Sequence, residues 1–207
     1  MIRVTLPDSW RSRAIVIGDA VFSDDWFTAE ELEQVAAFHL EKRRTEWKHS
    51  RIAAKQLAIE LKLCDEPHAA VIRRPRLVIR HRDANRFVSF SHSGGYAAAA
   101  IDTAPVGVDV EKQRLLREDA AHLFLTDDET AQMRGCSIAN RMLHFWSAKE
   151  AVWKQLEGVT ETLKRTPIQF ESETASGLLF REVETFATGE IVVALTRPTS
   201  AADSSRR

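Results

Sequence analysis

The stretch Phe145-Trp-Ser-Ala-Lys-Glu-Ala-Val-Trp-Lys154 sets charged side chains into a run that is otherwise apolar. Neither glycine nor proline occurs between residues 138 and 157, and apolar residues recur every three or four positions, at Ile138, Met142, Phe145, Ala148, Val152 and Leu156. This period predicts a packed helix over 138–157 that is ended by Gly158. At about 100° per residue, Glu150 and Lys154 lie on one edge of its apolar face and can reach into a cleft.

A second pattern, Gly107-Val-Asp-Val-Glu111, alternates apolar and acidic residues. In a strand, Asp109 and Glu111 point to one face, whereas Val108 and Val110 point to the other. Neighbouring carboxylates repel each other unless a cation or a proton lies between them, and their oxygens are ligands that suit Mg²⁺. Each pattern alone also fits a simpler explanation, which is an ordinary surface ion pair in the helix and a solvated face in the strand.

Together the two patterns resemble the paired signatures of the Sfp-type 4′-phosphopantetheinyl transferases, Gly-Ile/Val-Asp-Ile/Val-Glu and Trp-x-x-Lys-Glu-Ala/Ser-x-x-Lys. Every fixed position matches, and the resemblance covers residues 40–160. It implies the α+β fold of that family, a pseudo-twofold arrangement of two similar α+β halves with the site at their junction. It also implies an enzyme that transfers the 4′-phosphopantetheine arm of coenzyme A to a serine hydroxyl of an acyl or peptidyl carrier protein and releases 3′,5′-adenosine bisphosphate.

The resemblance also gives roles to the charged residues. Asp109, Glu111 and Glu150 are expected to hold one Mg²⁺ beside the diphosphate of coenzyme A, so that Asp109 counts among the coenzyme A-binding residues too. Glu150, or a metal-bound water that it orients, is the candidate base for the carrier serine. Lys154 is expected to contact the phosphates and to stabilise the departing product. Lys149 projects from the apolar face, so its ammonium needs a carboxylate or a backbone carbonyl that the sequence does not identify.

A basic cluster lies in the first half, in Arg43-Arg-Thr-Glu-Trp-Lys-His-Ser-Arg51-Ile-Ala-Ala-Lys55. The simpler explanation of such a run is a solvated helix face. The segment nevertheless resembles one that many bacterial members of the family use against the 3′-phosphate and adenine end of coenzyme A, and arginine offers phosphate a planar, bidentate fork. We favour Arg44 and Arg51 for this role, although the sequence does not decide between Arg43 and Arg44.

Two further segments match the family in part. Where the family has Gly-Lys-Pro, this chain has Arg73-Arg-Pro75, which makes Arg74 a candidate phosphate contact. Residues 89–94, Ser-Phe-Ser-His-Ser-Gly, match a family turn between two strands, so that Ser91 and His92 become candidates for binding a phosphate of coenzyme A. A lone histidine in a serine-rich turn can equally be structural.

The composition indicates a globular chain. Apolar residues make up 44% and charged residues 29%, and the net charge of −1 means that anion binding depends on local clusters. Cys64 and Cys136 lack the spacing of a zinc site or a disulfide framework. The start has no apolar leader region, and no run approaches the ~18 apolar residues of a membrane span. We therefore expect a cytoplasmic protein, a monomer, with no membrane or nucleic-acid partner.

The remaining periodicities predict a first half over residues 1–103, a second half over 104–198 and a flexible tail over 199–207. In the first half we expect a strand at 14–17, a helix that starts at the capping box Thr28–Glu31 and ends near Leu40, a helix over 43–62, and strands at 69–72, 77–80, 86–91 and 96–101. In the second half we expect helical segments at 117–124 and 127–134, and strands near 168–170, 178–183 and 191–196.

Three other functions compete with phosphopantetheine transfer. A nucleic-acid-binding module would use the basic cluster of residues 43–55 and a second one, the six arginines between residues 73 and 86, but leaves the three carboxylates unexplained. A Mg²⁺-dependent enzyme acting on another phosphorylated substrate would use the carboxylates but has no need for Ser91 and His92. A relative that binds coenzyme A without transferring its arm is disfavoured, because all the required side chains are present.

Overall fold

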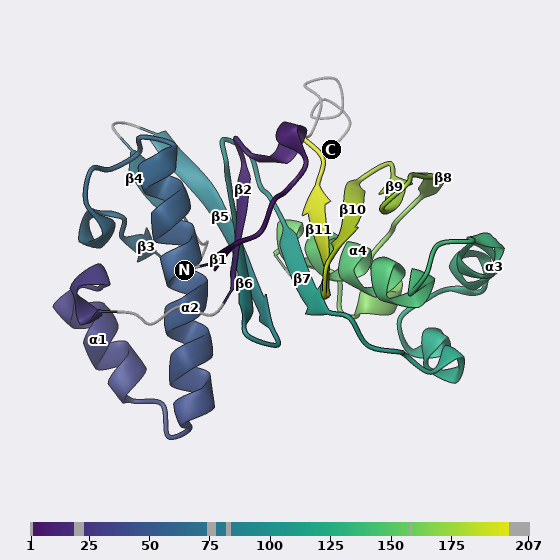
Figure 1. Ribbon diagram of the computed structural model, residues 1–207, viewed down its shortest axis with the longest axis horizontal. Helices are drawn as coiled ribbons and strands as arrows, with labels where there is room; N and C mark the ends of the chain where they lie inside the picture. Colours follow the sequence, from purple (N-terminus) through teal and green to yellow (C-terminus); the bar gives the residue numbers. More distant parts are fainter. Residues whose placement is uncertain (1, 19–22, 74–77, 82–83, 158, 199–207) are drawn as a thin grey trace.

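The chain folds into two antiparallel sheets, each with a long helix packed against it, as the computed structural model shows (Figure 1). It describes residues 2–18, 23–73, 78–81, 84–157 and 159–198. All strands of one sheet precede residue 103, and all strands of the other follow residue 107. Mixed helices and antiparallel strands of this kind confirm the predicted α+β class.

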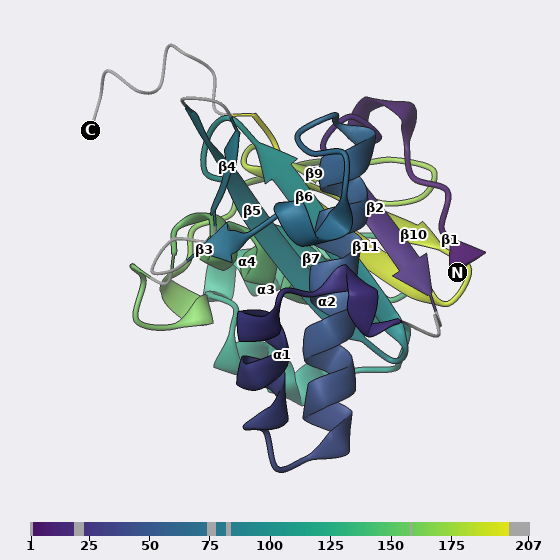
Figure 2. The ribbon, with the colours of Figure 1, turned by 90° about the vertical axis from the view of Figure 1, so that its left-hand side faces the viewer.

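The first sheet has the strand order β1-β2-β6-β5-β4-β3. Its strands are β1 (Ile2–Arg3), β2 (Ala14–Gly18), β3 (Ile72–Arg73), β4 (Val78–His81), β5 (Ala84–Ser93) and β6 (Tyr96–Asp102). The helices of this half are α1 (Ala29–Ala36) and α2 (Glu41–Glu60), with short 3₁₀ helices η1 (Asp8–Trp10), η2 (Asp24–Trp26) and η3 (Pro67–Ala69). In Figure 2, α1 and α2 lie in front of the strands of this sheet.

The second sheet has the order β7-β11-β10-β9-β8, so that β7 is an edge strand. Its strands are β7 (Val108–Lys112), β8 (Phe170–Glu173), β9 (Leu178–Phe180), β10 (Val183–Thr188) and β11 (Ile191–Thr196). The helices of this half are α3 (Asp127–Gly135) and α4 (Arg141–Gln155), with 3₁₀ helices η4 (Glu118–Leu123) and η5 (Leu163–Arg165).

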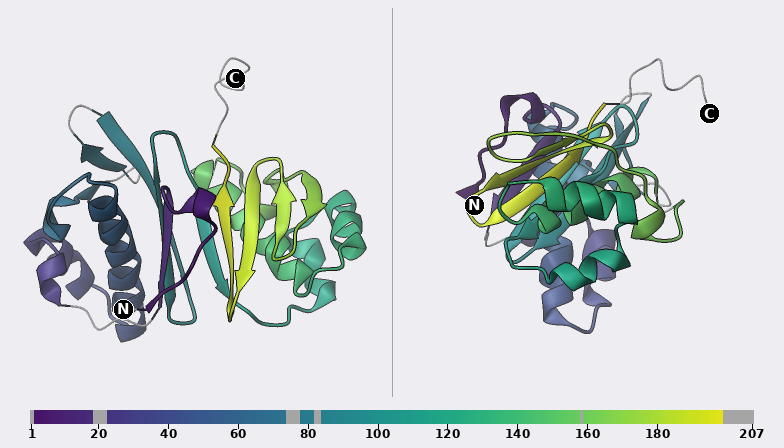
Figure 3. Two further views of the ribbon diagram at one scale, coloured as in Figure 1. Left: turned by 45° about the horizontal axis from the view of Figure 1, so that its top comes forward. Right: turned by 90° about the vertical axis from the view of Figure 1, so that its right-hand side faces the viewer.

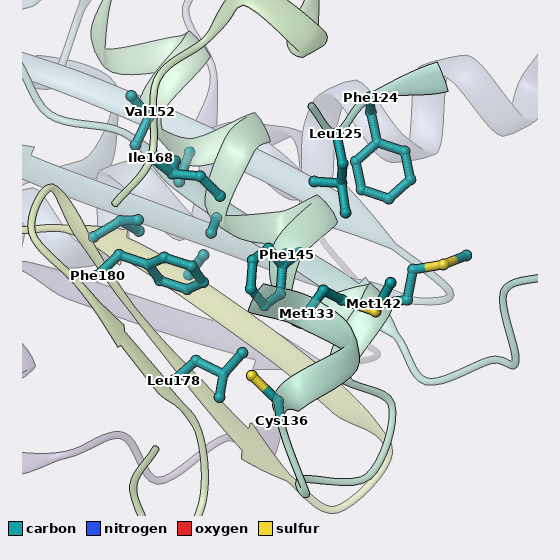
Figure 4. Packing of buried hydrophobic residues seen from close by; sticks show 14 of the residues in the cluster. Phe124, Leu125, Met133, Cys136, Met142, Phe145, Val152, Ile168, Leu178 and Phe180 are labelled. Carbon is teal, nitrogen blue, oxygen red and sulfur yellow. The ribbon is translucent and has the colours of Figure 1, made fainter. Parts of the chain in front are cut away.

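Three apolar cores hold these layers together. One lies between α2 and the first sheet, and includes Ile52 and Leu57 of the helix. Another lies between α4 and the second sheet, where Phe145 and Phe180 meet edge to face at a centroid distance of 5.0 Å (Figure 4). The third core joins the two sheets through residues such as Ala98 of β6. The sheets therefore lie between the two helical layers, as the views in Figure 3 show.

Several predicted boundaries are wrong. The helix predicted over 138–157 begins at Arg141 because Asn140 adopts a left-handed conformation with φ 55°, and it ends at Gln155. Gly158, the predicted stop, lies outside the described residues. Ile138 still packs on the core, so its position in the apolar period does not distinguish helix from loop.

Four other elements differ in extent or type. The helix predicted to end near Leu40 ends at Ala36, and Leu40 is exposed. The segment 117–124 is the 3₁₀ helix η4, because its backbone closes hydrogen bonds over three residues. The run 178–183 forms β9 and the start of β10, since Arg181 and Glu182 bond to Gln169 and turn the chain. Of the strand predicted at 69–72, only Ile72 lies in a strand, β3, because Ala69 ends the 3₁₀ helix η3 and residues 70 and 71 belong to neither element.

Two expectations made from composition can be compared with the structure. Cys64 and Cys136 are free thiols, as expected from their spacing. Among the described helices, none is both long and apolar enough to cross a membrane.

Candidate active site at the junction of the halves

The strand β7 carries its two carboxylates on the face opposite its valines. Val108 and Val110 are buried in the core between the sheets. Asp109, buried to 3% exposure, and Glu111 therefore point the other way, because side chains alternate along a strand. Since β7 is the edge of its sheet, one flank of this strand is open to contact from the first half.

That flank is covered by alternate serines of β5. Ser89 Oγ accepts a hydrogen bond from the Val108 amide at 3.1 Å. Ser91 Oγ donates to Asp109 Oδ1 at 2.8 Å, and Ser93 Oγ donates to Glu111 Oε2 at 3.0 Å. The strand from the first half thus orients both carboxylates of the second half.

Helix α4 brings the third group of charged residues to the same place. Lys154 Nζ donates to Asp109 Oδ1 at 2.7 Å and to Ser91 Oγ at 3.0 Å. The three side chains therefore form a closed triangle of hydrogen bonds across the junction. Trp146 Nε1, two turns before Lys154, donates to Glu111 Oε1 at 3.2 Å.

Glu150 is half-buried on the same helix. Burial raises the pKa of its carboxyl above the ordinary value. Lys154 opposes that shift, whereas the negative charges of Asp109 and Glu111 add to it. The negative charges of both β7 carboxylates therefore act on Glu150. They favour either a proton on its carboxyl or a cation close to it.

One carboxylate oxygen at the junction has no hydrogen-bond partner among the described residues and could bind a cation. Asp109 Oδ2 is buried and accepts no hydrogen bond from any residue in the described part of the chain. An anionic oxygen of this kind is costly unless a positive partner satisfies it. Within the described ranges, however, no three His, Cys, Asp or Glu side chains gather into a ready-made metal site. A cation bound at Asp109 would therefore need water and substrate phosphate to complete its coordination, as Mg²⁺ commonly does in proteins.

Lys149 has the partners that the sequence could not identify. Its ammonium lies 2.7 Å from Glu129 Oε2 and donates to the carbonyls of Thr166 at 2.9 Å and Lys164 at 3.2 Å. Burial lowers the pKa of Lys149, while the hydrogen bond and the charge of Glu129 act in the opposite direction. Lys149 therefore faces away from the group formed by Asp109, Ser91 and Lys154.

The two favoured arginines of α2 have different surroundings. The guanidinium of Arg51 is buried over the ring of Trp47, 3.4 Å from its centroid, and 5.3 Å from the ring of Phe90, the β5 residue next to Ser91. Arg44 instead donates to the Phe38 carbonyl at 2.7 Å and pairs with Glu41. The structure thus brings Arg51, but not Arg44, to the strand that carries Ser91.

The remaining candidates are spread more widely. The side chain of His92 is 44% exposed, and its Nδ1 lies 3.9 Å from Glu46 Oε1 on α2. Arg43 lies over the Phe38 ring. Arg74 lies outside the described residues. Ser91 and His92 belong to β5 itself, so the turn predicted there consists of Gly94 and Gly95, both with positive φ.

The sequence places Arg114 within reach of the site but assigns no role to it or to two other residues that contact the carboxylates. Ser93 and Trp146 bond Glu111, and Arg114 pairs with it at 3.0 Å. The signals were present, because Ser93 continues the alternation of Ser89 and Ser91, and Trp146 opens the helical motif. Arg114 carries no pattern of its own.

Residues 105–198 match the family model of the 4′-phosphopantetheinyl transferase superfamily. This match covers a little less than half of the chain and lies in its second half. The matched segment contains Asp109, Glu111, Glu150 and Lys154, so the similarity to the superfamily includes every candidate metal ligand. The candidate residues of α2 and β5 lie before it.

Curated relatives agree with this assignment over a limited length. The chain is 31% identical to a 4′-phosphopantetheinyl transferase of Bacillus subtilis over 70 residues, which are 32% of this chain and 31% of that protein. It is 33% identical to the 4′-phosphopantetheinyl transferase psf-1 of Bacillus pumilus over 69 residues, 32% of this chain and 30% of the relative. The chain thus spans less than a third of the length of these two relatives.

Proposed function

We propose that this protein transfers the 4′-phosphopantetheine arm of coenzyme A to a serine hydroxyl of an acyl or peptidyl carrier protein. The observation that carries the proposal is the triangle of Asp109, Ser91 and Lys154, in which a superfamily strand and helix meet a strand of the first half. Phosphoryl transfer uses groups that stabilise negative charge on the phosphates and a group that accepts a proton. Here these are a carboxylate that can bind a cation, Asp109, together with Lys154, and a carboxyl with a raised pKa, Glu150.

In this reaction the serine oxygen of the carrier forms a bond to the β-phosphorus of coenzyme A. The bond from that phosphorus to the bridging oxygen breaks, and 3′,5′-adenosine bisphosphate leaves. Glu150 takes the serine proton, a role that suits a carboxyl whose pKa is raised above its ordinary value by burial. Lys154 stabilises the negative charge on the phosphates, because its ammonium is already held at the junction by Asp109 and Ser91.

Asp109, Glu111 and Glu150 are the residues that would hold Mg²⁺. When bound, the ion would neutralise negative charge on the diphosphate. The buried, unpaired Oδ2 of Asp109 supports this assignment. Ser91 and Ser93 support it as well, since their hydrogen bonds fix the orientation of Asp109 and Glu111.

Coenzyme A would lie across the junction towards α2. Arg51 and His92 support binding of its phosphates, because Arg51 of α2 lies near Phe90 of β5 and His92 of β5 lies near Glu46 of α2. Arg44 and Arg74 stay predictions for this role, as do Ser91 and the cytoplasmic, monomeric state of the protein. Carrier proteins with acidic surfaces would be steered by the exposed basic residues, an attraction that added salt should weaken.

Removal of a carboxylate from the junction tests the proposal. Asp109→Ala and Glu150→Ala should each abolish transfer to an apo carrier protein, since each removes a group assigned to the metal or the proton. Transfer would be measured with Mg²⁺ present, and circular dichroism would establish that each variant is folded. Glu33→Ala, on an exposed position of α1, is the matched control and should keep wild-type turnover. Mg²⁺-dependent transfer by both junction variants would overturn the proposal.

A further inference from the structure

Two lysines whose side chains are wholly buried occupy corresponding places in the two halves. Lys55 lies on α2 and Lys149 on α4, the long helices that pack against the two sheets, and each is 0% exposed. An ammonium buried in this way is stable only when its charge and its three N–H donors are satisfied. The acceptors therefore show what each lysine holds in place.

In the second half, the acceptors of Lys149 come from two neighbouring elements. Glu129 Oε2, at 2.7 Å, belongs to the capping box that starts α3, where the same oxygen accepts from the Thr126 amide at 2.8 Å. The carbonyls of Lys164 and Thr166 lie in and after η5. Lys149 thus ties α4 to the first turn of α3 and to the segment around η5.

In the first half, the same arrangement recurs in the same chain order. Lys55 Nζ donates to Glu31 Oε2 at 2.8 Å, and that oxygen also accepts from the Thr28 amide in the capping box that starts α1. Its other two acceptors are the carbonyls of Pro67 and Ala70, each at 3.2 Å, in and after η3. Each half therefore has a capping-box glutamate, a buried lysine and a pair of carbonyls at a 3₁₀ helix.

Each of these lysines fixes how its helix is rotated. With three acceptors in three directions, the ammonium keeps its bonds only in one orientation of the helix, and a rotation would leave a buried charge unpaired. Glu150 follows Lys149 directly and is rotated from it by about 100° around the helix. Lys154 lies one turn after Glu150. Arg51 precedes Lys55 by one turn on α2. On α4, the residues that face the junction are therefore set by bonds made on another side of the helix, whereas on α2 Arg51 lies on nearly the same side as Lys55.

We propose that Lys149 is a positioning residue for Glu150 and Lys154, and that Lys55 is the corresponding positioning residue for Arg51. The proposal rests on the proposed transfer reaction for its kinetic consequences, but the anchoring of each helix is independent of that reaction. Glu129 and Glu31 share these roles, because each bridges its lysine and the start of a short helix. The two lysines contact neither substrate nor metal in this account.

Paired substitutions in each half test the proposal. Glu129→Gln with Lys149→Met removes both buried charges together, and the glutamine carbonyl can still accept the Thr126 amide of the capping box. Glu31→Gln with Lys55→Met makes the same change in the other half and is the matched comparison. Amide hydrogen exchange needs no substrate, and should become faster in α4 for the first pair and in α2 for the second.

Steady-state kinetics with coenzyme A and an apo carrier protein separate positioning from simple loss of folded protein. For Glu129→Gln/Lys149→Met, kcat should fall about tenfold or more, with less than about threefold change in the KM for coenzyme A. For Glu31→Gln/Lys55→Met, the KM for coenzyme A should rise about threefold or more, with kcat within about twofold of wild type. A merely structural role would instead lower kcat in both pairs in proportion to lost stability.

The outcomes distinguish the two proposals. Wild-type protein that transfers nothing overturns the proposed function, and the exchange experiment then decides the anchoring alone. Active wild type together with unchanged kcat and unchanged exchange in Glu129→Gln/Lys149→Met overturns the positioning role of Lys149. If that pair does not fold, the single variant Glu129→Asp answers instead, since it keeps both charges and only shortens the side chain that reaches Lys149, and a wild-type kcat with unchanged exchange there would equally contradict the proposal.

Discussion

His144 is a buried histidine on α4 that takes no part in the proposed reaction. Its Nδ1 lies 2.8 Å from Thr185 Oγ1 of β10, while Nε2 has no partner among the residues that the structure describes. Burial lowers its pKa from 6.5 to about 4. The imidazole is therefore neutral in the folded protein at pH values where the unfolded chain would already be protonated.

This shift predicts a loss of stability in mild acid. Because the folded pKa lies below the unfolded value, the unfolded state gains a proton first as the pH falls below 6.5, and stability declines until about pH 4. At pH ~5, this group alone should lower the free energy of unfolding by ~2 kcal/mol relative to pH ~8. Urea unfolding of wild type and His144→Phe at both pH values measures the difference. The exposed control His39→Phe should behave as wild type, and equal pH dependence in all three would contradict the prediction.

At the same scale, sequence patterns predict some site residues and not others. The strict alternation of residues 107–111 is sufficient to place Asp109 and Glu111 on one face, because the period of a strand leaves no other choice. The partner of Lys149 was not predictable, since Glu129 and the carbonyls of Lys164 and Thr166 reach it only through tertiary packing. Arg44 shows that a match to a family segment does not by itself place a side chain at the site. Its guanidinium donates to the nearby Phe38 carbonyl and not to a group at the junction.

At the scale of elements, the start of β7 lies in close contact with α4 beside the site. A Cβ added to Gly107, just before β7, would lie 1.8 Å from the Ala151 carbonyl oxygen and 2.9 Å from the Gln155 amide nitrogen. The glycine that opens the Gly-Val-Asp-Val-Glu pattern therefore lets the strand lie against the helix that carries Glu150 and Lys154. Any side chain there would force the two elements apart.

Gly107→Ala should consequently impair both stability and activity. Overpacking of this contact should lower the free energy of unfolding by about 2 kcal/mol or more and reduce turnover, because β7 and α4 must separate. Gly135→Ala at the end of α3 is the control, since its added Cβ meets nothing within 4 Å. Denaturant unfolding and the transfer assay measure both variants. A fully stable and active Gly107→Ala would show that the contact is not as tight as described.

Sequence periodicity also predicts the elements unevenly. The capping boxes at Thr28 and Thr126 mark the starts of α1 and α3 correctly, because the hydrogen-bonding groups of a cap lie in adjacent residues. The start of α4 was predicted too early, since Ile138 packs on the core from a loop and only the backbone of Asn140 reveals the break. Apolar spacing thus predicts which residues are buried better than where a helix begins.

At the scale of the whole molecule, the two halves share one core and one site. The core between the sheets combines Val16 and Ala98 of the first half with Val110 and Val193 of the second. Trp10 Nε1 also donates to Glu184 Oε2 across the junction at 2.9 Å. Separation of the halves would expose this apolar surface and break the contacts of Ser91 with Asp109 and Lys154.

We therefore expect the chain to unfold in one cooperative transition. Thermal unfolding followed by far-ultraviolet circular dichroism and by tryptophan fluorescence should give coincident curves, because separation of the halves would expose the apolar core between the sheets. Two separate transitions would contradict a shared core. The division of the chain between residues 103 and 104 stays a prediction. The correspondence of Lys55 and Lys149 could not be predicted, because the two halves show no sequence repeat.

The most direct test of the central claim is the intact mass of an apo carrier protein after incubation with this protein, coenzyme A and Mg²⁺. We predict a gain of one phosphopantetheine unit, lost when a chelator is added and absent with Asp109→Ala or Glu150→Ala. No gain on fatty-acid, polyketide and peptidyl carriers, with folded wild-type protein, would contradict the claim that the junction of the two halves is a phosphopantetheinyl transferase site.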